Sequence, residues 1–164
     1  MVEQIKLPVP SVDLQDQEDS ILLTSLIFLK TRNDIKQSKV GVACVVRNRT
    51  RHPRWWGKNY KQVILPLIDY YKLTEEEKKL LQNPIKFDLS KEWDDCYLIA
   101  KGILNNTIQD ITFNSDYFFL TSEKLPSWLN SKFRQPTTNQ WFVCTMGNVQ
   151  FYRVELKWNN GNPT

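Results

Sequence analysis

Apolar residues recur at helical spacing through the first two thirds of the chain. Asp19 or Ser20 can cap a helix whose apolar positions cover most of its circumference, so we expect this helix to be central. It should end near residues 32–34, where the sequence turns polar. A second helix is predicted over roughly 35–49, and Pro53 prevents it from continuing.

Three more helical stretches follow before the pattern changes. An amphipathic stretch over 60–71 contains Pro66, which should kink it. Thr74 with Glu77 has the S/T-x-x-E pattern of a capping box and opens a short helix. Residues 91–105 again carry apolar side chains at helical spacing, which predicts another helix.

The last third of the chain has the pattern of strands. Residues 116–120 and 140–145 are rich in strand-forming residues, and 149–156 alternates well enough to form a hairpin with the preceding strand. A short helix over 126–130 interrupts the strands. Helices followed by a small sheet predict an α+β fold, with a helix-rich single domain and a small antiparallel C-terminal sheet.

The 164 residues are enough for one domain. We expect an extended N-terminal arm over 1–17 that lies on a neighbouring molecule or stays mobile, a domain over 18–158, and a flexible tail over 159–164. The arm lacks the layout of a signal peptide. No apolar run approaches the roughly 18 residues of a membrane span.

Composition narrows the chemistry. Aromatic residues make up 12% of the chain and include 6 Trp, which indicates an aromatic core or a groove that stacks flat ligands. The single His argues against a His-rich zinc site or a Ser-His-Asp triad. Cys44, Cys96 and Cys144 lie on apolar faces without metal-ligand spacing, so we expect buried free thiols. No cofactor or metal is predicted.

Charge is unevenly distributed. No acidic residue occurs between Ile35 and Ile68, whereas this stretch carries eight basic ones. Such a stretch favours an anionic partner such as nucleic acid, or else forms a solvated face that the acidic N-terminal arm balances. The basic residues concerned are Lys36, Lys39, Arg47, Arg49, Arg51, Arg54, Lys58 and Lys61.

Several short segments occur in a recognisable order. They are VGVACVVRNR at 40–49, PRWW at 53–56, AKGILN at 100–105 with DIT at 110–112, YFF at 117–119, PSW at 126–128 and GNVQFY at 147–152. In this order they resemble the motifs of the SleB-type cell wall hydrolases, a family of spore-cortex-lytic enzymes, phage lysins and virion hydrolases. The resemblance spans roughly residues 20 to 153.

The resemblance implies a lysozyme-like domain that cleaves the glycan strands of peptidoglycan, often as a lytic transglycosylase. The family's catalytic Glu stands in an I-Y-G-E-A-R-G-E motif at the end of the first helix. The matching stretch at 27–34 reads IFLKTRND, so Lys30 occupies the catalytic position, Arg32 keeps the Arg and Asp34 replaces the second acid. In the family's G-N-H-x-F-Y motif, Asn148 and Tyr152 are kept and Val149 replaces the His.

Lys30 is a poor substitute for the missing acid. Glycan cleavage needs a proton for the leaving oxygen and negative charge beside the developing oxocarbenium ion. An ammonium group with an ordinary pKa near 10.4 donates a proton poorly and repels that cation. Asp34 is the nearest carboxylate that can replace the acid, although it can also form an ordinary i,i+4 pair with Lys30.

Aromatic side chains supply the candidate sugar-binding surface. Trp93 and Trp141 are expected in the core, whereas adjacent Trp55 and Trp56 cannot both point inward easily, so we expect one of them to be exposed. Together with the residues kept in family motifs, these give the predicted substrate-binding set. Its members are Arg32, Trp55, Trp56, Tyr117, Trp128, Asn148 and Tyr152.

Three functions remain open. The first is an active glycosidase or lytic transglycosylase that uses Asp34. The second is a pseudoenzyme that serves as a structural or binding component of a phage particle, with peptidoglycan or other phage structural proteins as partners. The third is a nucleic-acid binder using the basic stretch 36–61. Loss of the catalytic Glu favours the second, which is expected in the virion or the host cell envelope after synthesis in the cytoplasm.

Overall fold

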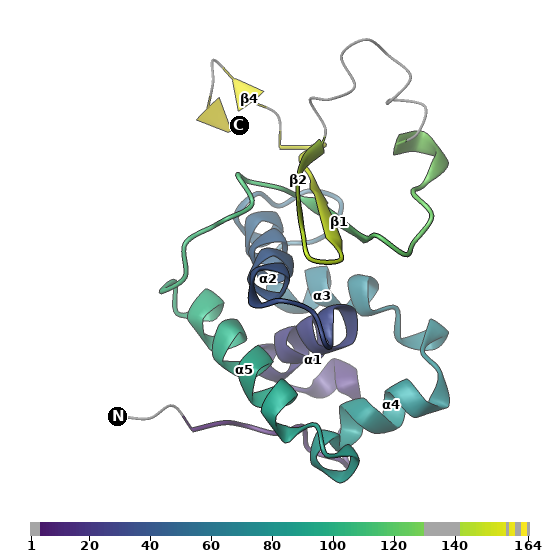
Figure 1. Cartoon of the computed structure of the whole chain (residues 1–164). Helices are drawn as coiled ribbons and strands as arrows, with labels where there is room; N and C mark the ends of the chain where they lie inside the picture. Colours follow the sequence, from purple (N-terminus) through teal and green to yellow (C-terminus); the bar gives the residue numbers. More distant parts are fainter. Residues whose placement is uncertain (1–3, 130–141, 157, 160–161, 164) are drawn as a thin grey trace.

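The computed structural model describes residues 4–129, 142–156, 158–159 and 162–163. Five α-helices gather at one end of the molecule and a small sheet lies at the other (Figure 1). The helices are α1 (Asp19–Thr31), α2 (Lys36–Arg51), α3 (Tyr60–Ile68), α4 (Glu75–Gln82) and α5 (Ser90–Leu104), with 3-10 turns η1 (Leu14–Asp16), η2 (Tyr70–Lys72) and η3 (Pro84–Phe87). The strands are β1 (Tyr117–Leu120), β2 (Phe142–Met146), β3 (Val149–Tyr152), β4 (Trp158–Asn159) and β5 (Asn162–Pro163).

Helix α1 is the centre of the helical end, as its apolar circumference predicts. Ten of its 13 residues are buried, and α2, α3 and α5 all pack against it. Its buried hydroxyl groups need partners, and they find them within the helix: Thr24 Oγ1 donates to the Ser20 carbonyl and Ser25 Oγ to the Ile21 carbonyl. The prediction of a central first helix is therefore confirmed.

The predicted start of α4 holds, whereas α1 has Glu18 as its N-cap in place of Asp19 or Ser20, and the stretch predicted over 60–71 leaves the helix at left-handed Asp69. Thr74 Oγ1 accepts from the Glu77 backbone N–H at 3.1 Å, and Glu77 Oε1 accepts from the Thr74 backbone N–H at 3.0 Å, which is the predicted capping box. Pro66 lies inside α3, which ends two residues later at Ile68. Within the described residues, no helix is long and apolar enough to span a membrane.

Helix α2 supports the sheet. A Cβ atom added to Gly41 would lie 2.3 Å from the Phe151 ring, so this position has no room for a side chain. Phe151, on the central strand β3, is fully buried against the helix. The small residue on α2 therefore brings the sheet close to the helical core.

The sheet has the order β1-β3-β2 and is antiparallel, so the α+β prediction is confirmed. The predicted strand over 149–156, however, stops at Tyr152. Backbone N–H groups of Val154, Glu155 and Leu156 all donate to the carboxylate of Asp116, and this side chain replaces a strand partner. The end of the predicted helix over 126–130, like Trp141 and the start of the predicted strand over 140–145, lies outside the described residues.

The described part of the N-terminal arm contacts its own domain. Trp93 Nε1, on α5, donates to the Lys6 carbonyl at 2.8 Å. Buried Gln17 closes the arm on itself, because its amide donates to the carbonyls of Val9 and Val12. These contacts hold parts of the arm against its own domain, and the expected contact with a neighbouring molecule stays a prediction.

Candidate functional site

The sheet carries aromatic side chains on the face that points away from the helices. Side chains alternate along a strand, so Tyr117 and Phe119 leave β1 on one side while Phe118 and Leu120 leave on the other. Phe118 joins the main core, and Tyr117 pairs across the sheet with Tyr152 on β3. Aromatic residues therefore line both faces, with the outer face available for another role.

Tyr117 is the centre of a ring cluster on this outer face. Its ring centroid lies 6.5 Å from that of Trp55, and 5.5 Å from that of Trp128. Trp55 comes from the loop after α2, and Trp128 from a helical turn after β1, so three separate segments bring their rings together. We call Trp55, Tyr117 and Trp128 the aromatic platform.

The platform is accessible at its two edges. Trp55 is 70% exposed, Trp128 is 40% exposed, and Tyr117 between them is half-buried. Adjacent Trp56 is only 4% exposed, and its Nε1 donates to the Arg49 carbonyl at 2.9 Å. The prediction that one of the two adjacent Trp side chains is exposed is confirmed, and Trp56 is removed from the substrate-binding set because burial leaves it no free surface.

Tyr152 also leaves the predicted binding set. It is 2% exposed and belongs to a second small core that Leu129 and Val154 share. Phe119 packs edge-on against it, with ring centroids 5.6 Å apart. The segment that carries Trp128 thus covers this end of the sheet. Tyr152 packs beneath the platform, in the small core that Tyr117 also contacts, and does not reach solvent.

A buried cation lies beside the platform. The guanidinium carbon of Arg49 is 4.8 Å from the Tyr117 ring centroid and 5.8 Å from that of Trp55, which are cation–π distances. Arg49 Nε donates to the Asp116 carbonyl at 2.7 Å, which fixes the side chain. Burial lowers the pKa of Arg49 and raises the pKa of Tyr117 to about 12, so at neutral pH the first stays charged and the second neutral.

Asp116 holds the same region from inside. Its side chain is fully buried and accepts the three backbone N–H groups at the end of β3 that replace a strand partner. Burial raises the pKa of this carboxyl, and the three hydrogen bonds offset only part of that effect. Since it has no access to solvent, Asp116 has a structural role and is not an acid that a substrate can reach.

Two of the sequence motifs, VGVACVVRNR at 40–49 and DIT at 110–112, are joined by a hydrogen bond. Asn48 on α2 donates to Asp110 Oδ2 at 3.3 Å and to the Ser115 carbonyl at 2.9 Å. Asp110 Oδ1 accepts the backbone N–H of Thr112 at 2.8 Å, which closes a turn. Segments 62 residues or more apart in the chain are therefore joined, and the motif residues act by positioning β1.

Lys30, which the sequence predicts at the family's catalytic position, lies elsewhere, at the end of α1. Lys30 is half-buried in the last turn of α1. The C-terminal carbonyl of Thr31 accepts from Lys39 Nζ, and this ammonium also pairs with Glu92. A cation at this end of a helix is favoured by the helix dipole. We call Lys30, Arg32, Asp34 and Asn148 the α1 corner.

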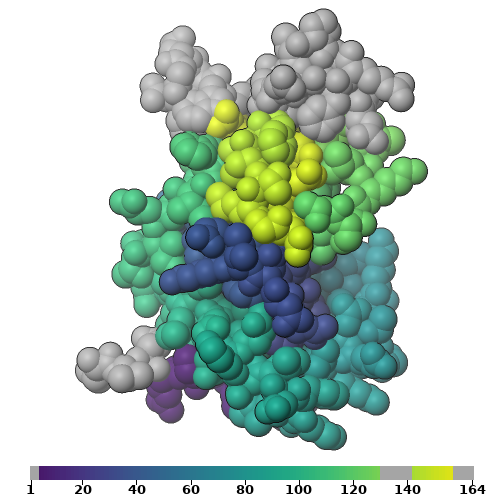
Figure 2. All heavy atoms as spheres, in the orientation of Figure 1, coloured from purple at the N-terminus to yellow at the C-terminus, as the bar shows by residue number. Residues whose placement is uncertain are grey.

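The carboxylate of Asp34 is hydrogen-bonded to the β2–β3 hairpin and not to Lys30. Its Oδ2 accepts the backbone N–H of Asn148 at 2.9 Å and its Oδ1 that of Ile35 at 2.8 Å, so the hairpin lies against the start of α2 (Figure 2). Helix α1 has already ended at Thr31, and the expected i,i+4 geometry with Lys30 is lost. Gly147 leaves room for the carboxylate, because a Cβ there would lie 2.2 Å from Oδ1.

The environment of Asp34 makes it a poor proton donor. Partial burial alone would raise the pKa of its carboxyl, but the hydrogen bonds from the Asn148 and Ile35 backbones together outweigh burial, and the pKa lies below its ordinary value. A general acid for glycan cleavage needs a raised pKa near neutrality. The geometry therefore argues against Asp34 as a substitute for the missing Glu.

The predicted site residues thus fall into two groups. The aromatic platform lies at the Tyr117 end of β1, whereas Asn148 lies in the hairpin turn at the opposite end of the sheet. Four residues of strand separate the two ends, about 10 Å at 3.4 Å per residue. Arg32 lies with the second group, its guanidinium 5.8 Å from the Phe28 ring centroid.

The basic stretch does not form a continuous surface. Lys39, Arg47 and Arg49 are 3–5% exposed, and each of them donates to a carbonyl of the chain. Arg51 is exposed and donates to Asn106 Oδ1. Three of the eight basic side chains are therefore committed to the interior, which weakens the interpretation as a nucleic-acid-binding face.

The thiols have no metal partners within the described residues, where no group of three His, Cys, Asp or Glu is placed to hold an ion. Burial raises the pKa of Cys44 to about 11 and that of Cys96 to about 12, so both are protonated at neutral pH. Cys144 is only half-buried, which corrects the expectation that all three are buried.

Sequence reasoning missed the supports of the platform. Arg49 was assigned to a basic stretch, although its neighbours in the sequence are the apolar positions of a buried helix. Phe119 belongs to the same segment as Tyr117, and the two-residue alternation of a strand was the signal for it. No local signal identifies Glu92, whose ion pair with Lys39 joins α2 to α5.

Comparisons with known proteins give two matches. A family model described as Cell Wall Hydrolase matches residues 33–152, which is more than half of the chain. The fold is similar to the catalytic domain of the germination-specific lytic transglycosylase SleB from Bacillus anthracis, with a TM-score of 0.54 and 14% sequence identity, covering 84% of this chain and 96% of that domain. No curated protein matches the sequence.

Proposed function

Because the chain belongs to the Cell Wall Hydrolase family, we propose that it binds the glycan strands of peptidoglycan on the aromatic platform without cleaving them. The observation that carries the proposal is the contrast between two places in the fold. Exposed rings suited to sugars are present at one end of the sheet, whereas a Lys and a hydrogen-bonded Asp occupy the α1 corner, where the family's acid belongs.

The platform suits a sugar chain because it offers flat apolar surfaces with polar edges. Pyranose rings present C–H groups on their faces, and these pack on aromatic rings, while their hydroxyl groups remain at the edges. Trp55 and Trp128 lie on either side of Tyr117, so neighbouring rings are available to consecutive sugars. Arg49 stabilises the arrangement from below by its contacts with Trp55 and Tyr117.

Catalysis fails in this proposal for a chemical reason. Lys30 cannot supply the negative charge that stabilises an oxocarbenium ion, and the lowered pKa of Asp34 keeps that carboxyl ionised at neutral pH. Asp116 has a raised pKa but no access to solvent. Asp34 therefore lacks the proton that the reaction requires, and Asp116 lacks the access.

The experiment uses purified sacculi with the intact chain and the variant Trp55→Ala. The wild type should sediment with the sacculi and release no soluble muropeptides. Trp55→Ala should bind about two- to tenfold more weakly, because one stacking contact is worth about 0.5–1.5 kcal/mol. A matched control is Phe87→Ala, which removes an exposed ring on η3, in the helical part of the molecule. Muropeptide release by the wild type that is lost in Asp34→Asn would contradict the proposal.

Location in a phage particle or host envelope stays a prediction, as does association with other phage structural proteins. Mass spectrometry of purified particles can test it, since the chain should be present in stoichiometric amounts if it is a structural component. Nucleic acid is the weaker alternative because Lys39, Arg47 and Arg49 point into the fold. Tight, salt-sensitive binding of single-stranded DNA would favour that alternative.

A further inference from the structure

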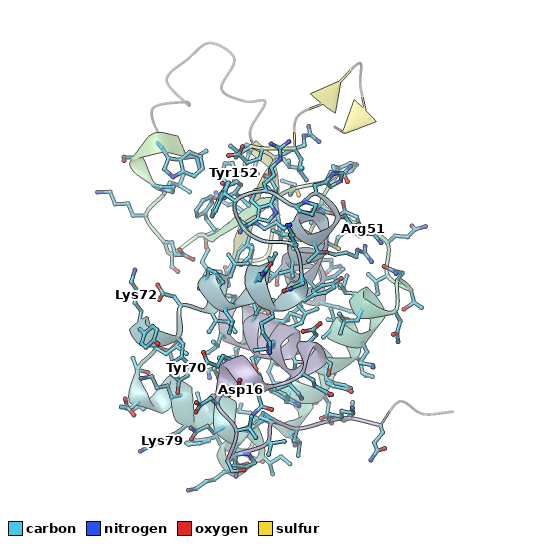
Figure 3. The ribbon with its side chains drawn as sticks, turned by 180° about the vertical axis from the view of Figure 1, so that it is seen from behind. Asp16, Arg51, Tyr70, Lys72, Lys79 and Tyr152 are labelled. Atoms are coloured by element: carbon cyan, nitrogen blue, oxygen red, sulfur yellow. The ribbon has the colours of Figure 1, made fainter. Side chains whose placement is uncertain are left out.

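A second cavity lies far from the aromatic platform. It has a volume of about 350 Å³ and opens between the segment 13–15 before α1 and the end of α3 with η2. Figure 3 shows Tyr70 and Asp16 toward the helical end of the molecule and Tyr152 toward the sheet end. The volume falls at the lower end of the range of about 300–1,000 Å³ that is typical of small-molecule sites.

Two consecutive tyrosines form one wall of the cavity. The ring centroids of Tyr70 and Tyr71 are 6.2 Å apart with an interplanar angle of 80°. Tyr71 is 93% exposed, so its ring contributes almost nothing to the core. The ring lies beside the cavity with almost all of its surface open to a ligand.

The ring of Tyr70 is held in place from its other side. Lys78 Nζ lies 5.0 Å from its centroid, at a cation–π distance. Tyr70 lines both the large cavity and a smaller one of about 70 Å³, whereas Lys78 lines only the smaller. The ammonium group of Lys78 therefore lies at the smaller cavity and does not occupy the larger one, which Tyr70 also lines.

Polar side chains surround these rings. Asp13 and Gln15 line the wall opposite the tyrosines, and Asp69 stands at the junction of α3 and η2. The backbone of Asp69 is left-handed, with φ of 51°, and its carboxylate is 3.3 Å from Lys72 Nζ, so its position is fixed. Carboxylate and amide oxygens accept hydrogen bonds from hydroxyl groups, and the remaining lining includes apolar Leu65 and Pro66.

We propose that this cavity is a second carbohydrate site, which binds one N-acetylhexosamine unit of a glycan strand. The Tyr71 ring stacks on the sugar face with Tyr70 edge-on beside it, Asp13, Gln15 and Asp69 accept hydrogen bonds from its hydroxyl groups, and Leu65 and Pro66 contact the acetyl methyl group. The choice of glycan rests on the proposed function, whereas the site itself is separate from the platform. Two sites on one chain would raise its apparent affinity for long strands.

The experiment is a titration of the intact chain with N-acetylglucosamine tetramer, followed by amide NMR shifts. Residues 69–72 and 13–15 should shift as one group and 117–119 as another. Tyr71→Ala should weaken the binding measured at the first group at least fivefold and leave the second unchanged. Tyr71→Phe, which keeps the ring, should bind like the wild type. Thermal unfolding should not change in either variant, because the ring is exposed.

The outcomes separate the two proposals. Shifts confined to 117–119 would overturn the second site and leave the platform as the sugar site. Shifts confined to the cavity, unaffected by Trp55→Ala, would overturn the platform and leave the second site standing. Absence of shifts at both would overturn both. Shifts at the cavity that persist unchanged in Tyr71→Ala would also overturn the second site, since the ring would then have no part in binding.

Discussion

The α1 corner and the aromatic platform lie at opposite ends of one small sheet, and they differ in how each is held. Asp34 fixes the corner through two hydrogen bonds at a partly exposed carboxylate. Asp116 fixes the platform end through three hydrogen bonds at a fully buried one. The binding end is thus built into the interior, whereas the corner is attached at the surface.

Under the proposed function, this difference gives a physical reason why binding can persist where catalysis is lost. Substitution at the end of α1 touches a single turn and one hairpin contact, so the helix can exchange a Glu for Lys30 without disturbing the sheet. The platform depends on Arg49, which contacts two of its rings and the backbone of Asp116. A change there would disturb the core as well as the surface.

Restoring the acid is the strongest test of this comparison. Lys30→Glu should raise the release of soluble muropeptides from sacculi by about 10²-fold or more over the wild type, because a general acid contributes about 10²- to 10⁴-fold. Lys30→Gln, which removes the cation without supplying an acid, should stay inactive. If Lys30→Glu is also inactive while sugar binding persists, the α1 corner lacks further groups that catalysis needs. Sugar binding at the platform would then depend even less on the α1 corner than we propose.

Removing the buried carboxylate should have the next largest effect. Asp116→Ala leaves three buried N–H groups without an acceptor, each costing about 1 kcal/mol or more, so the free energy of unfolding should fall by about 3 kcal/mol. Asp116→Asn keeps one acceptor oxygen and should lose less. Denaturant unfolding monitored by Trp fluorescence measures both. Equal losses in the two variants would mean that packing, not hydrogen bonding, holds this end.

The smallest effect is expected at the corner and depends on pH. Because the pKa of Asp34 is lower in the folded chain, its stabilising effect is present above its unfolded pKa of about 3.9 and is lost as the pH falls through the folded pKa. Asp34→Asn should cost about 1 kcal/mol or less at pH 7, since the carboxylate is partly exposed. The difference between wild type and variant should shrink toward zero near pH 2. A difference that stays constant with pH would show that charge has no part in this contact.

Much of the fold could be predicted because its signals are local. The apolar circumference of α1 and the capping box of α4 each depend on residues within one or two turns, and both were found. The exposure of one of two adjacent Trp residues followed from chain geometry alone, and Trp55 is that residue. The order of the family motifs was sufficient to identify the family, as the match over residues 33–152 confirms.

The candidate site was harder to predict because its contacts are distant in sequence. Asp116 ends a predicted strand by binding residues 38 to 40 positions later, and no local pattern signals this. Tyr152 and Trp56 have the composition of ligand-binding residues but are buried by segments that fold over them. Burial of an aromatic ring is decided by what packs on it, which the identity of the residue does not reveal.

The sequence by itself determined the helices, the small sheet and the family, and it predicts that Lys30 stands where the family has its acid. These depend on local periodicity and on the order of motifs. Only the tertiary structure decided which aromatic rings reach solvent, that Asp34 turns to the hairpin, and that Arg49 is buried beside the platform. The reason is that exposure, pKa and ring contacts depend on groups that are brought together only when distant segments pack.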